Sequence, residues 1–414
     1  MKPRIAMLSV HTSPLASLGG KETGGMNVYI REACRALAKR EWQIDIFTRA
    51  QDDGPKVIVD QPAPGCRTIN IAAGPCSPMD RREVFGCLPE FAEGMRTFCR
   101  QDGAEYALFH SHYWLSGWVA KELRRERLIP LVHMFHTLGR MKDSTAQAPE
   151  HREAGNRAQV EQEIMGCADR IVAATPLDRM QMLNMYHVQE ARIVVIPCGV
   201  NLELFHPIAQ EQAREAIHVP ANKRMILFVG RLDPVKGLSF LLKALCDLRD
   251  INPSMTKNLC LAIIGGDRES HLRSLVDDMD CIARMKQQYE PDDMVVFYGA
   301  QTQEVLPGYY SASDVCVMPS LYESFGMVAL EAMACGIPVI ASRVGGLTFT
   351  VRDGETGFLV PERNSKALAE KLNLVLGDEC LRQRLGHRAA QVALGYSWDI
   401  VADQLEALYA ELGV

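Results

Sequence analysis

Short apolar runs alternate with amphipathic helical patterns along most of the chain, and this alternation limits the possible fold more than any other feature. In the first half, apolar runs at residues 5–10 and 43–48 flank a loop at 11–22 and a helical pattern that continues to Ala38. A strand, loop, helix and strand in this order form a parallel sheet with a right-handed crossover. Further apolar runs lie at 67–71, 106–110, 128–133, 170–174 and 192–196.

The alternation begins again after a polar, turn-rich segment at residues 197–207, which is predicted to link two domains. A chain of 414 residues is also longer than most single-core domains. We therefore predict an α/β fold with two Rossmann-like, doubly wound domains, at 1–205 and 206–396. The strands expected in the second domain lie at 224–229, 259–264, 295–298, 315–318, 338–341 and 357–360.

The composition, with 47% hydrophobic and 23% charged residues, is typical of a globular protein. A net charge of -6 argues against nucleic acid as a partner. The 13 cysteines include no CxxC pair, which favours a reducing compartment over a disulfide framework or a zinc site. Apolar runs are too short for a membrane span, and the N-terminal run is too short for a signal peptide. We expect a cytoplasmic protein without an integral membrane segment.

Two polar segments, at residues 142–163 and 266–293, interrupt the alternation. Each is interpreted either as a mobile loop beside the functional site or as a solvated helix with its connector.

Residues 314–351 carry the strongest functional pattern. An apolar run at 315–318 ends at Pro319, and a helix is predicted over 326–335, with Gly336 as its left-handed cap. Its first turn is predicted at 324–327, at the carboxyl end of a parallel sheet, where N–H groups bind a phosphate or a sugar hydroxyl.

Two glutamates accompany this helix. Glu323 stands just outside its start and Glu331 about two turns inside, a separation of up to roughly 12 Å at the helical rise. Acceptor groups at that spacing could hold the two ends of a nucleotide sugar. The alternative is that both are solvated side chains on an ordinary crossover helix.

The segment FVGRLDPVKG places Arg231 directly after a predicted strand and Lys236 five residues later. Two cations on one loop at the carboxyl edge of a sheet can neutralise a diphosphate. Exposed ion-pair partners are the alternative, but their place beside Gly230 and Gly237 favours binding. In the first domain, the spacing GGKETGG at 19–25 matches neither GxGxxG nor GxxxxGK[ST], which disfavours a dehydrogenase or a kinase.

Histidines and cations follow the strands of the first domain. Alternation would place His110 and His112 on one face, but further metal ligands are not evident, so we expect no metal ion. One histidine of the set that also includes His133 and His136 is expected to face a substrate.

A group of polar side chains also comes from the first domain and from loops that follow its strands. If these side chains converge, they would bind the phosphate of a second substrate; otherwise each cation among them is surface charge. This group is Arg81, Tyr113, Thr137, Arg140, Lys142 and Arg157.

Taken together, these motifs resemble the GT-B retaining glycosyltransferases of family 4, in the branch that holds sucrose-phosphate synthase and the mycothiol-pathway glycosyltransferase acting on inositol phosphate. The resemblance covers nearly the whole chain. GGMN at 24–27 is shared with the inositol-phosphate enzyme, whereas sucrose-phosphate synthases more often have glutamine at the position of Met26. The second domain, notably EVLPGYYSASDVCVMPS at 304–320, is more similar to bacterial sucrose-phosphate synthases. The motifs that carry the resemblance are HTSPLASLGG, GGMNVY, HSHYWLSG, HTLGRMK, GRLDPVKG, ESFGMVALEAMACGIPV and GGLTFTVRDGETG.

The resemblance implies two Rossmann-like domains facing across a cleft, with a last helix at 397–414 that returns to the first domain. It implies that Arg231 and Lys236 hold the donor diphosphate, Glu331 the ribose and Glu323 the transferred sugar, and that His136 lies beside sugar and acceptor. The implied catalytic residues are His136, Arg231, Lys236 and Glu323. The implied donor-binding residues are Gly20, Gly25, Gly230, Arg231, Lys236, Glu323, Ser324, Phe325, Gly326, Met327 and Glu331. The implied acceptor-binding residues are Asn27, Arg81, Tyr113, Thr137, Lys142 and Arg157, with arginine at 81 where some relatives have lysine.

The predicted function is transfer, with retention, of a hexosyl group from a nucleotide sugar, UDP-glucose in the first instance, to a sugar phosphate. Fructose 6-phosphate, giving sucrose 6-phosphate, is the first acceptor considered. The alternatives are N-acetylglucosaminyl transfer to inositol phosphate, a nucleotide-sugar epimerase and a non-catalytic sugar-nucleotide sensor. We expect no cofactor and no metal, because cations and a helix terminus would stabilise the leaving diphosphate. Sequence gives no indication of the oligomeric state.

Overall fold

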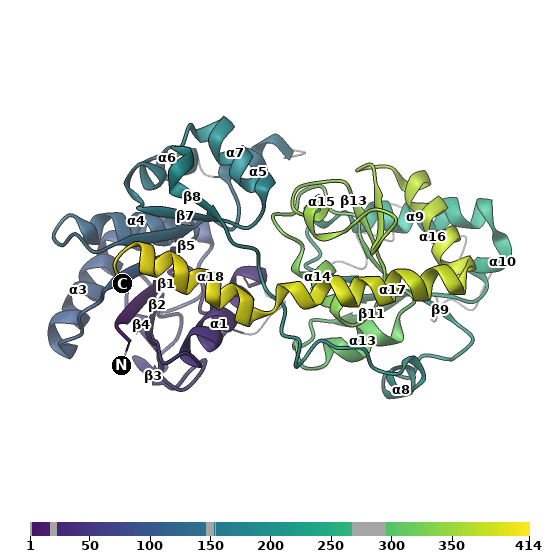
Figure 1. Cartoon of the computed structure of the whole chain (residues 1–414), viewed down its shortest axis with the longest axis horizontal. Coiled ribbons are helices and arrows are strands. Elements are labelled where there is room, and N and C mark those ends of the chain that lie inside the picture. The colour runs from purple at the N-terminus through teal and green to yellow at the C-terminus, as the bar shows by residue number, and fades with distance from the viewer. Residues whose placement is uncertain (1, 17–22, 146–152, 154, 267–294) are drawn as a thin grey trace. The chain divides into compact units, whose positions relative to one another are not determined.

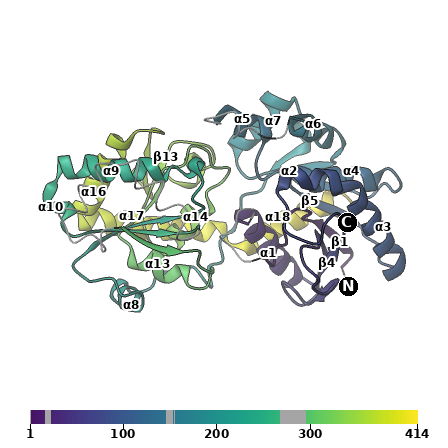
Figure 2. The same ribbon diagram turned by 180° about the vertical axis from the view of Figure 1, so that it is seen from behind.

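The computed structural model describes residues 2–16, 23–145, 153, 155–266 and 295–414. The described chain divides into two compact units, each a sheet of mainly parallel strands with helices on both faces (Figures 1 and 2). The first unit contains residues 2–16, 23–198 and Trp398–Val414, and the second contains Gly199–Ser397. The predicted fold class, two Rossmann-like domains with a C-terminal helix that returns to the first, is confirmed.

The first sheet has the strand order β3-β4-β2-β1-β5-β6-β7-β8 within the described residues. All neighbours pair in parallel except β3, which is antiparallel to β4 at the edge. The inner strands are buried along nearly their whole length, as in sheets covered on both faces. Their bounds are β1 Arg4–Leu8, β2 Gln43–Arg49, β3 Val57–Val59, β4 Cys66–Ile71, β5 Leu108–His112, β6 Leu131–Met134, β7 Arg170–Ala173 and β8 Ile193–Val195.

Helices of the first unit present apolar faces to this sheet. In α1, for example, Ile30, Ala33 and Leu37 are buried at helical spacing. The helix bounds are α1 Gly25–Ala38, α2 Arg81–Val84, α3 Leu88–Asp102, α4 Tyr113–Arg124, α5 Gly139–Thr145, α6 Arg157–Cys167, α7 Pro176–Tyr186 and α18 Trp398–Glu411. Two short 3-10 helices, η1 Phe85–Cys87 and η3 Glu190–Arg192, complete the unit's described helical segments.

The last helix, α18, packs beside α1 in the first unit (Figure 1). Tyr409 Oη lies 2.7 Å from His110 Nδ1 of β5, and Trp42 Nε1 donates to Glu406 Oε1 at 2.7 Å. Arg40 donates to the carboxylate of Asp403 at 2.8 Å. Buried polar contacts and ring packing therefore attach the C-terminal segment to the first sheet.

The second sheet has the order β11-β10-β9-β12-β13-β14 in the described part of the chain, and every neighbouring pair is parallel. Numbered within the unit, this order is 3-2-1-4-5-6, that of dinucleotide-binding Rossmann domains. The strand bounds are β9 Arg224–Val229, β10 Leu259–Ile264, β11 Val295–Gly299, β12 Val315–Met318, β13 Val339–Ser342 and β14 Gly357–Val360.

Around this sheet, buried Asp314 ties several elements together. Its carboxylate accepts from Arg214 at 2.9 Å and from the Met225 N–H at 2.7 Å, and Arg382 lies 3.3 Å away. The helices are α8 Gln210–Ala216, η4 Pro234–Lys236, α9 Leu238–Ile251, α10 Pro253–Thr256, α13 Leu306–Ala312, α14 Met327–Ala334, α15 Leu347–Thr350, α16 Ser365–Gly377, α17 Glu379–Ala393 and η6 Leu394–Tyr396.

Several predicted bounds need correction. The run at 128–133 begins the strand too early, because Leu128 is 91% exposed and β6 starts at Leu131. Strand β3 was not predicted, since it has three residues at a sheet edge.

The solvated-helix interpretation of 142–163 is wrong for α6, in which Arg157, Val160 and Ile164 are buried. The segment 266–293 lies almost wholly outside the described residues.

Helix α14 also begins later than predicted. It starts at Met327 with Gly326 as its N-cap at φ 92°, so residues 324–326 precede the first turn. Gly336 takes the left-handed conformation expected of a cap, at φ 78°. Glu331 therefore lies about one turn inside the helix instead of two.

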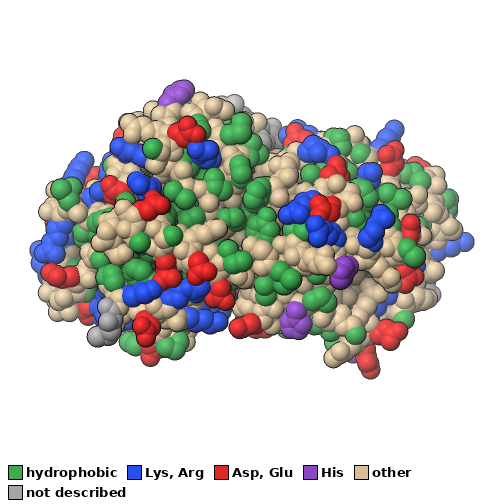
Figure 3. All heavy atoms as spheres, viewed as in Figure 1, with side chains coloured by type: hydrophobic (Ala, Val, Ile, Leu, Met, Phe, Trp, Pro, Cys, Tyr) green, Lys and Arg blue, Asp and Glu red, His purple; other side chains and the backbone are tan. Residues whose placement is uncertain are grey.

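The described helices include none long and apolar enough to cross a membrane. Figure 3 shows Lys and Arg side chains mixed with Asp and Glu over the visible face of each unit.

Candidate active site

Each sheet contains one pair of neighbouring strands from which the chain connections run in opposite directions, β1 and β5 in the first sheet and β9 and β12 in the second. Loops at the carboxyl ends of such strands diverge and leave a crevice in which ligands bind. Arg231 and Lys236 follow β9, and Glu323 follows β12. Tyr113 follows β5.

In the second unit, Lys236 Nζ lies 2.5 Å from Glu323 Oε2. The two side chains are 23% and 17% exposed, so the pair is partly open to solvent. Arg231 Nη2 lies 4.0 Å from Asp233 Oδ2 on the same loop. The structure thus brings a cation and a carboxylate of the predicted donor site together at the point where the strand order reverses.

The loop that carries Lys236 is closely fitted to its neighbour. The Leu321 N–H donates to the Val235 carbonyl at 2.7 Å and joins η4 to the loop after β12. Gly237 caps η4 at φ 71°, and a Cβ there would lie 2.0 Å from the Pro319 carbonyl oxygen. Only glycine fits this close approach.

We therefore expect Gly237→Ala to destabilise the second unit by about 3 kcal/mol or more, since a strained left-handed backbone adds to a backbone clash. Gly299→Ala is the matched control, because Gly299 has φ 69° and a Cβ added there would meet no atom within 4 Å. Calorimetric unfolding of the whole chain measures both. Equal losses in the two variants would contradict the close-approach argument.

Glu331 is buried, at 6% exposure, and its carboxylate accepts from Gln303 Nε2 at 3.1 Å and from Tyr310 Oη at 2.8 Å. Burial and the adjacent carboxylate raise the pKa of Tyr310. The solvated alternative is therefore wrong for Glu331. Phe325 is also buried, which leaves its backbone, and not its ring, to line a site.

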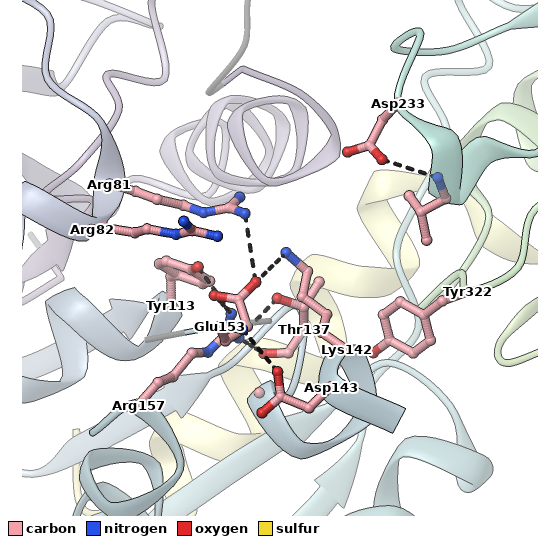
Figure 4. A network of polar contacts seen from close by, with 12 residues as sticks. Arg81, Arg82, Tyr113, Thr137, Lys142, Asp143, Glu153, Arg157, Asp233 and Tyr322 are labelled. Carbon is pink, nitrogen blue, oxygen red and sulfur yellow. Dashed lines mark hydrogen bonds and ion pairs between the residues drawn. The ribbon is translucent and has the colours of Figure 1, made fainter. Parts of the chain in front are cut away.

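In the first unit, Arg81 of α2, Lys142 of α5 and Arg157 of α6 converge on Glu153 (Figure 4). The distances to its carboxylate oxygens are 3.5 Å from Arg81 Nη2, 2.8 Å from Lys142 Nζ and 2.9 Å from Arg157 Nη1. We call Arg81, Lys142 and Arg157 the cation cluster.

Arg157 is the centre of the cation cluster and its side chain is fully buried. It donates to Tyr113 Oη at 3.1 Å, and to the Thr137 carbonyl and hydroxyl at 2.6 and 3.0 Å. Its Nε donates to buried Glu161 at 2.7 Å. Five predicted acceptor-binding residues are thus brought together, and surface charge is the wrong interpretation for Arg157. Arg140 does not join them, since its guanidinium lies over the Tyr186 ring at 4.7 Å.

Sequence reasoning missed the two carboxylates that organise Arg157. Glu161 lies four residues after Arg157 on α6, a helical spacing that places ionic partners together, whereas Glu153 lies before the start of α6. It also missed His11, which is buried and whose ring centre lies 4.6 Å from that of Tyr113. Within the described residues His11 Nδ1 has no hydrogen-bond partner.

The cation cluster shifts the ionisation of its neighbours. Burial would raise the pKa of Glu153, but Arg157, Lys142 and Arg81 together lower it to about 2. Burial and then the charge of Arg81 lower the pKa of Lys142 to about 8, although Glu153 opposes them. Burial, followed by the three cations, lowers the pKa of His11 to about 3. The cluster therefore holds an ionised carboxylate beside a neutral histidine.

Two residues at these strand ends have strained backbones. Tyr113 has φ 71° and His136 has φ 59°, conformations that bulky side chains adopt mainly where function requires them. His136 Nε2 lies 3.0 Å from His112 Nδ1. Burial, with the charge of His110 and His11, lowers the pKa of His136 to about 3, so His136 is neutral at physiological pH. His110 and His112 share a face as predicted, with ring centres 4.4 Å apart.

Asn27 is buried and holds the loop between β1 and α1. Its amide nitrogen donates to Thr12 Oγ1 at 2.8 Å and to the Ser13 carbonyl at 2.7 Å, while its oxygen accepts from the Gly24 N–H at 2.9 Å. Gly25 is the first residue of α1, and Gly20 lies outside the described residues.

Among the residues that the structure describes, no group of three or more His, Cys, Asp and Glu side chains is placed to hold a metal ion.

Two family models match the chain, one for each half. "Glycosyltransferase Family 4" matches residues 23–204, and "Glycosyl transferases group 1" matches residues 209–392. The D-inositol 3-phosphate glycosyltransferase of Corynebacterium glutamicum is 38% identical over 409 residues, covering 98% of this chain and 96% of that protein. The enzyme of the same name from Corynebacterium urealyticum is 39% identical over 412 residues, covering 99% and 96%.

Solved structures give a similar result. Sucrose-phosphate synthase from Thermosynechococcus elongatus superposes with a TM-score of 0.88 at 37% identity, over 99% of both chains. Anabaena Alr3699/HepE, in complex with UDP-glucose, superposes with a TM-score of 0.73 at 18% identity over 99% of this chain and 100% of that one, which supports the fold alone.

Proposed function

Because the chain belongs to the family 4 glycosyltransferases of GT-B fold, we propose that it transfers a hexosyl group from a nucleotide sugar to a hydroxyl of a sugar or polyol phosphate, with retention. The observation that carries the acceptor half of this proposal is the convergence of the cation cluster on one anionic group, with the hydroxyls of Tyr113 and Thr137 bound to Arg157 beside it. Arginine forks and a lysine ammonium are the side chains that bind phosphate best.

The donor half of the proposal is supported by the loops after β9 and β12. Lys236 and Arg231 would neutralise the donor diphosphate, and the N-terminus of α14 would supply backbone N–H groups to the donor. Glu331, oriented by Gln303 and Tyr310, would accept from the ribose hydroxyls. Glu323 would accept from the hydroxyls of the transferred sugar.

The chemistry follows from where charge develops. When the bond to the anomeric carbon breaks, negative charge builds on the diphosphate, and fixed cations stabilise it without a metal ion. Because no carboxylate nucleophile has been assigned, we favour attack by the acceptor hydroxyl on the face that the diphosphate leaves, with the diphosphate taking the proton. Neutral His136 would hydrogen-bond the transferred sugar.

Fructose 6-phosphate, which would give sucrose 6-phosphate, is the first acceptor to test, since a sucrose-phosphate synthase of solved structure is 37% identical to this chain. Inositol phosphate, with UDP-N-acetylglucosamine as donor, is the second. It is favoured by the GGMN motif at 24–27 and by curated relatives named for D-inositol 3-phosphate. Both acceptors present a phosphate and several hydroxyls.

A product assay by mass tests the proposal. UDP-glucose, GDP-glucose and UDP-N-acetylglucosamine are each offered with fructose 6-phosphate, with inositol phosphate and alone. Transfer predicts an acceptor heavier by one glycosyl residue and an equal amount of released nucleoside diphosphate. A nucleotide sugar of unchanged mass that chromatography separates from the donor, formed in the absence of acceptor, would support an epimerase, and no conversion in any arm would support a sensor.

The proposal also predicts a pH dependence for the acceptor step. Lys142 is cationic below its pKa of about 8 and neutral above it, so kcat/KM for the phosphorylated acceptor should fall as pH rises through about 8. The second ionisation of the phosphate lies lower, near pH ~6, and does not produce this decline. Lys142→Arg retains the charge and should abolish it. An unchanged profile in Lys142→Arg would remove Lys142 from the acceptor site.

A further inference from the structure

Glu153 occupies the centre of the cation cluster. Both of its carboxylate oxygens contact the cluster: Oε1 accepts from Lys142 at 2.8 Å and from Arg81 at 3.5 Å, and Oε2 forms an ion pair with Arg157 at 2.9 Å (Figure 4). Its side chain is only 6% exposed. A carboxylate bound through two oxygens by two guanidinium groups and an ammonium makes the charge-assisted contacts that a bound phosphate would make.

A phosphate cannot bind these three cations while Glu153 remains among them. The two anions would compete for the same N–H donors, and like charges a few ångströms apart repel strongly in a largely buried site. In the phosphate-free protein Glu153 is ionised, because the three cations lower its pKa to about 2.

We propose that Glu153 occupies, in the acceptor-free protein, the place of the acceptor's phosphate, and that the phosphate binds by displacing this carboxylate from Arg81, Lys142 and Arg157. The inference rests on the proposed function, since it assumes a phosphorylated acceptor.

The two carboxylates that contact Arg157 differ in how firmly they are held. Glu161 lies within α6, accepts from the Gly139 N–H at 3.0 Å and from the Tyr186 hydroxyl, and is fully buried. Glu153 lies outside α5 and α6, and its backbone N–H donates to Asp143 Oδ1 at 2.8 Å. Displacing Glu153 therefore leaves Arg157 paired with Glu161 and removes no residue from α5 or α6. Glu161 is the permanent partner and Glu153 the exchangeable one.

This exchange would also select for charge. A phosphate dianion that replaces Glu153 adds a negative charge to the cation cluster, whereas a monoanionic carboxylate only substitutes for it. The cluster should therefore favour phosphorylated acceptors over sugar acids of similar size.

The test is calorimetric titration of the full chain with inorganic phosphate, in the wild type and in Glu153→Gln. The variant keeps the shape of the side chain and removes its charge. It should bind phosphate at least about tenfold more tightly, because removing one competing charge from a charge-assisted site changes the affinity by about that factor. Glu163→Gln is the matched control, because Glu163 lies on α6 with its side chain 43% exposed and should leave phosphate affinity unchanged. Adding Arg81→Ala to Glu153→Gln should abolish the gain and so place the phosphate at the cation cluster.

The outcomes separate the two proposals. If the wild type binds phosphate and Glu153→Gln binds it no more tightly, Glu153 supports the cluster and the displacement proposal is wrong. If neither binds phosphate, the phosphate-acceptor assignment itself fails. Should Glu153→Gln not fold, Glu153→Asp decides, because it keeps the charge but withdraws the carboxylate by one methylene and should tighten binding by a smaller factor; no tightening would overturn the proposal.

Discussion

Replacing Lys236 with alanine is expected to lower kcat by about 10²–10³-fold, the usual cost of removing one fixed group that stabilises charge developing in the transition state. Lys236 follows β9 and pairs with Glu323 at 2.5 Å in the donor-free protein. In the proposed reaction its ammonium neutralises the leaving diphosphate. Turnover of the active donor and acceptor pair, measured at saturating concentrations of both, gives kcat directly.

Lys243→Ala is the control for this experiment. Lys243 lies on the exposed face of α9, in the same unit, and its removal changes the net charge by the same amount. It should leave kcat within about twofold of the wild type, since surface charges away from a site contribute little. Near-normal turnover in Lys236→Ala, with the fold intact, would remove Lys236 from the diphosphate site.

Glu161→Ala is expected to destabilise the first unit by about 3–5 kcal/mol, because it leaves a buried guanidinium without its permanent partner. Arg157 and Glu161 are both 0% exposed and lie 2.7 Å apart. The variant also removes the acceptor of the Gly139 N–H. Denaturant unfolding followed by tryptophan fluorescence measures this loss selectively, because the four tryptophans of the chain, Trp42, Trp114, Trp118 and Trp398, all lie in the first unit.

Glu163→Ala is the matched control for stability. Its exposed carboxylate pairs with Lys121 of α4 at 2.7 Å, and such surface pairs contribute about 0–1 kcal/mol. A loss in Glu161→Ala no larger than that of Glu163→Ala would mean that the Arg157 network does not stabilise the unit.

Burial explains which elements could be predicted. The runs at 224–229, 259–264, 315–318 and 357–360 correspond residue for residue to β9, β10, β12 and β14, because strands covered on both faces are continuously apolar. For the short edge strand β3 and at loop junctions this signal fails. Leu128 is apolar yet exposed, and β3 is too short for its pattern to stand out.

The candidate site was predictable to a different extent in each unit. Glycine-rich turns and cations at strand ends indicated the loop with Arg231 and Lys236, since such a turn can be read from local sequence. Arg157 was indicated as one of a group of cations, but its partners Glu153 and Glu161 were not, because buried ionic partners in a polar segment look like solvated charges until the fold covers them. The four-residue helical spacing of Arg157 and Glu161 was the available signal.

The proposed function is tested most directly by asking whether the acceptor must carry a phosphate. Fructose 6-phosphate and inositol phosphate are each compared with their unphosphorylated forms, with UDP-glucose and UDP-N-acetylglucosamine as donors, and glycosylated product is measured by mass. The account predicts product from a phosphorylated acceptor and at least about a hundredfold less from its unphosphorylated form, since two or more charge-assisted contacts are lost. Equal product from both forms would contradict it.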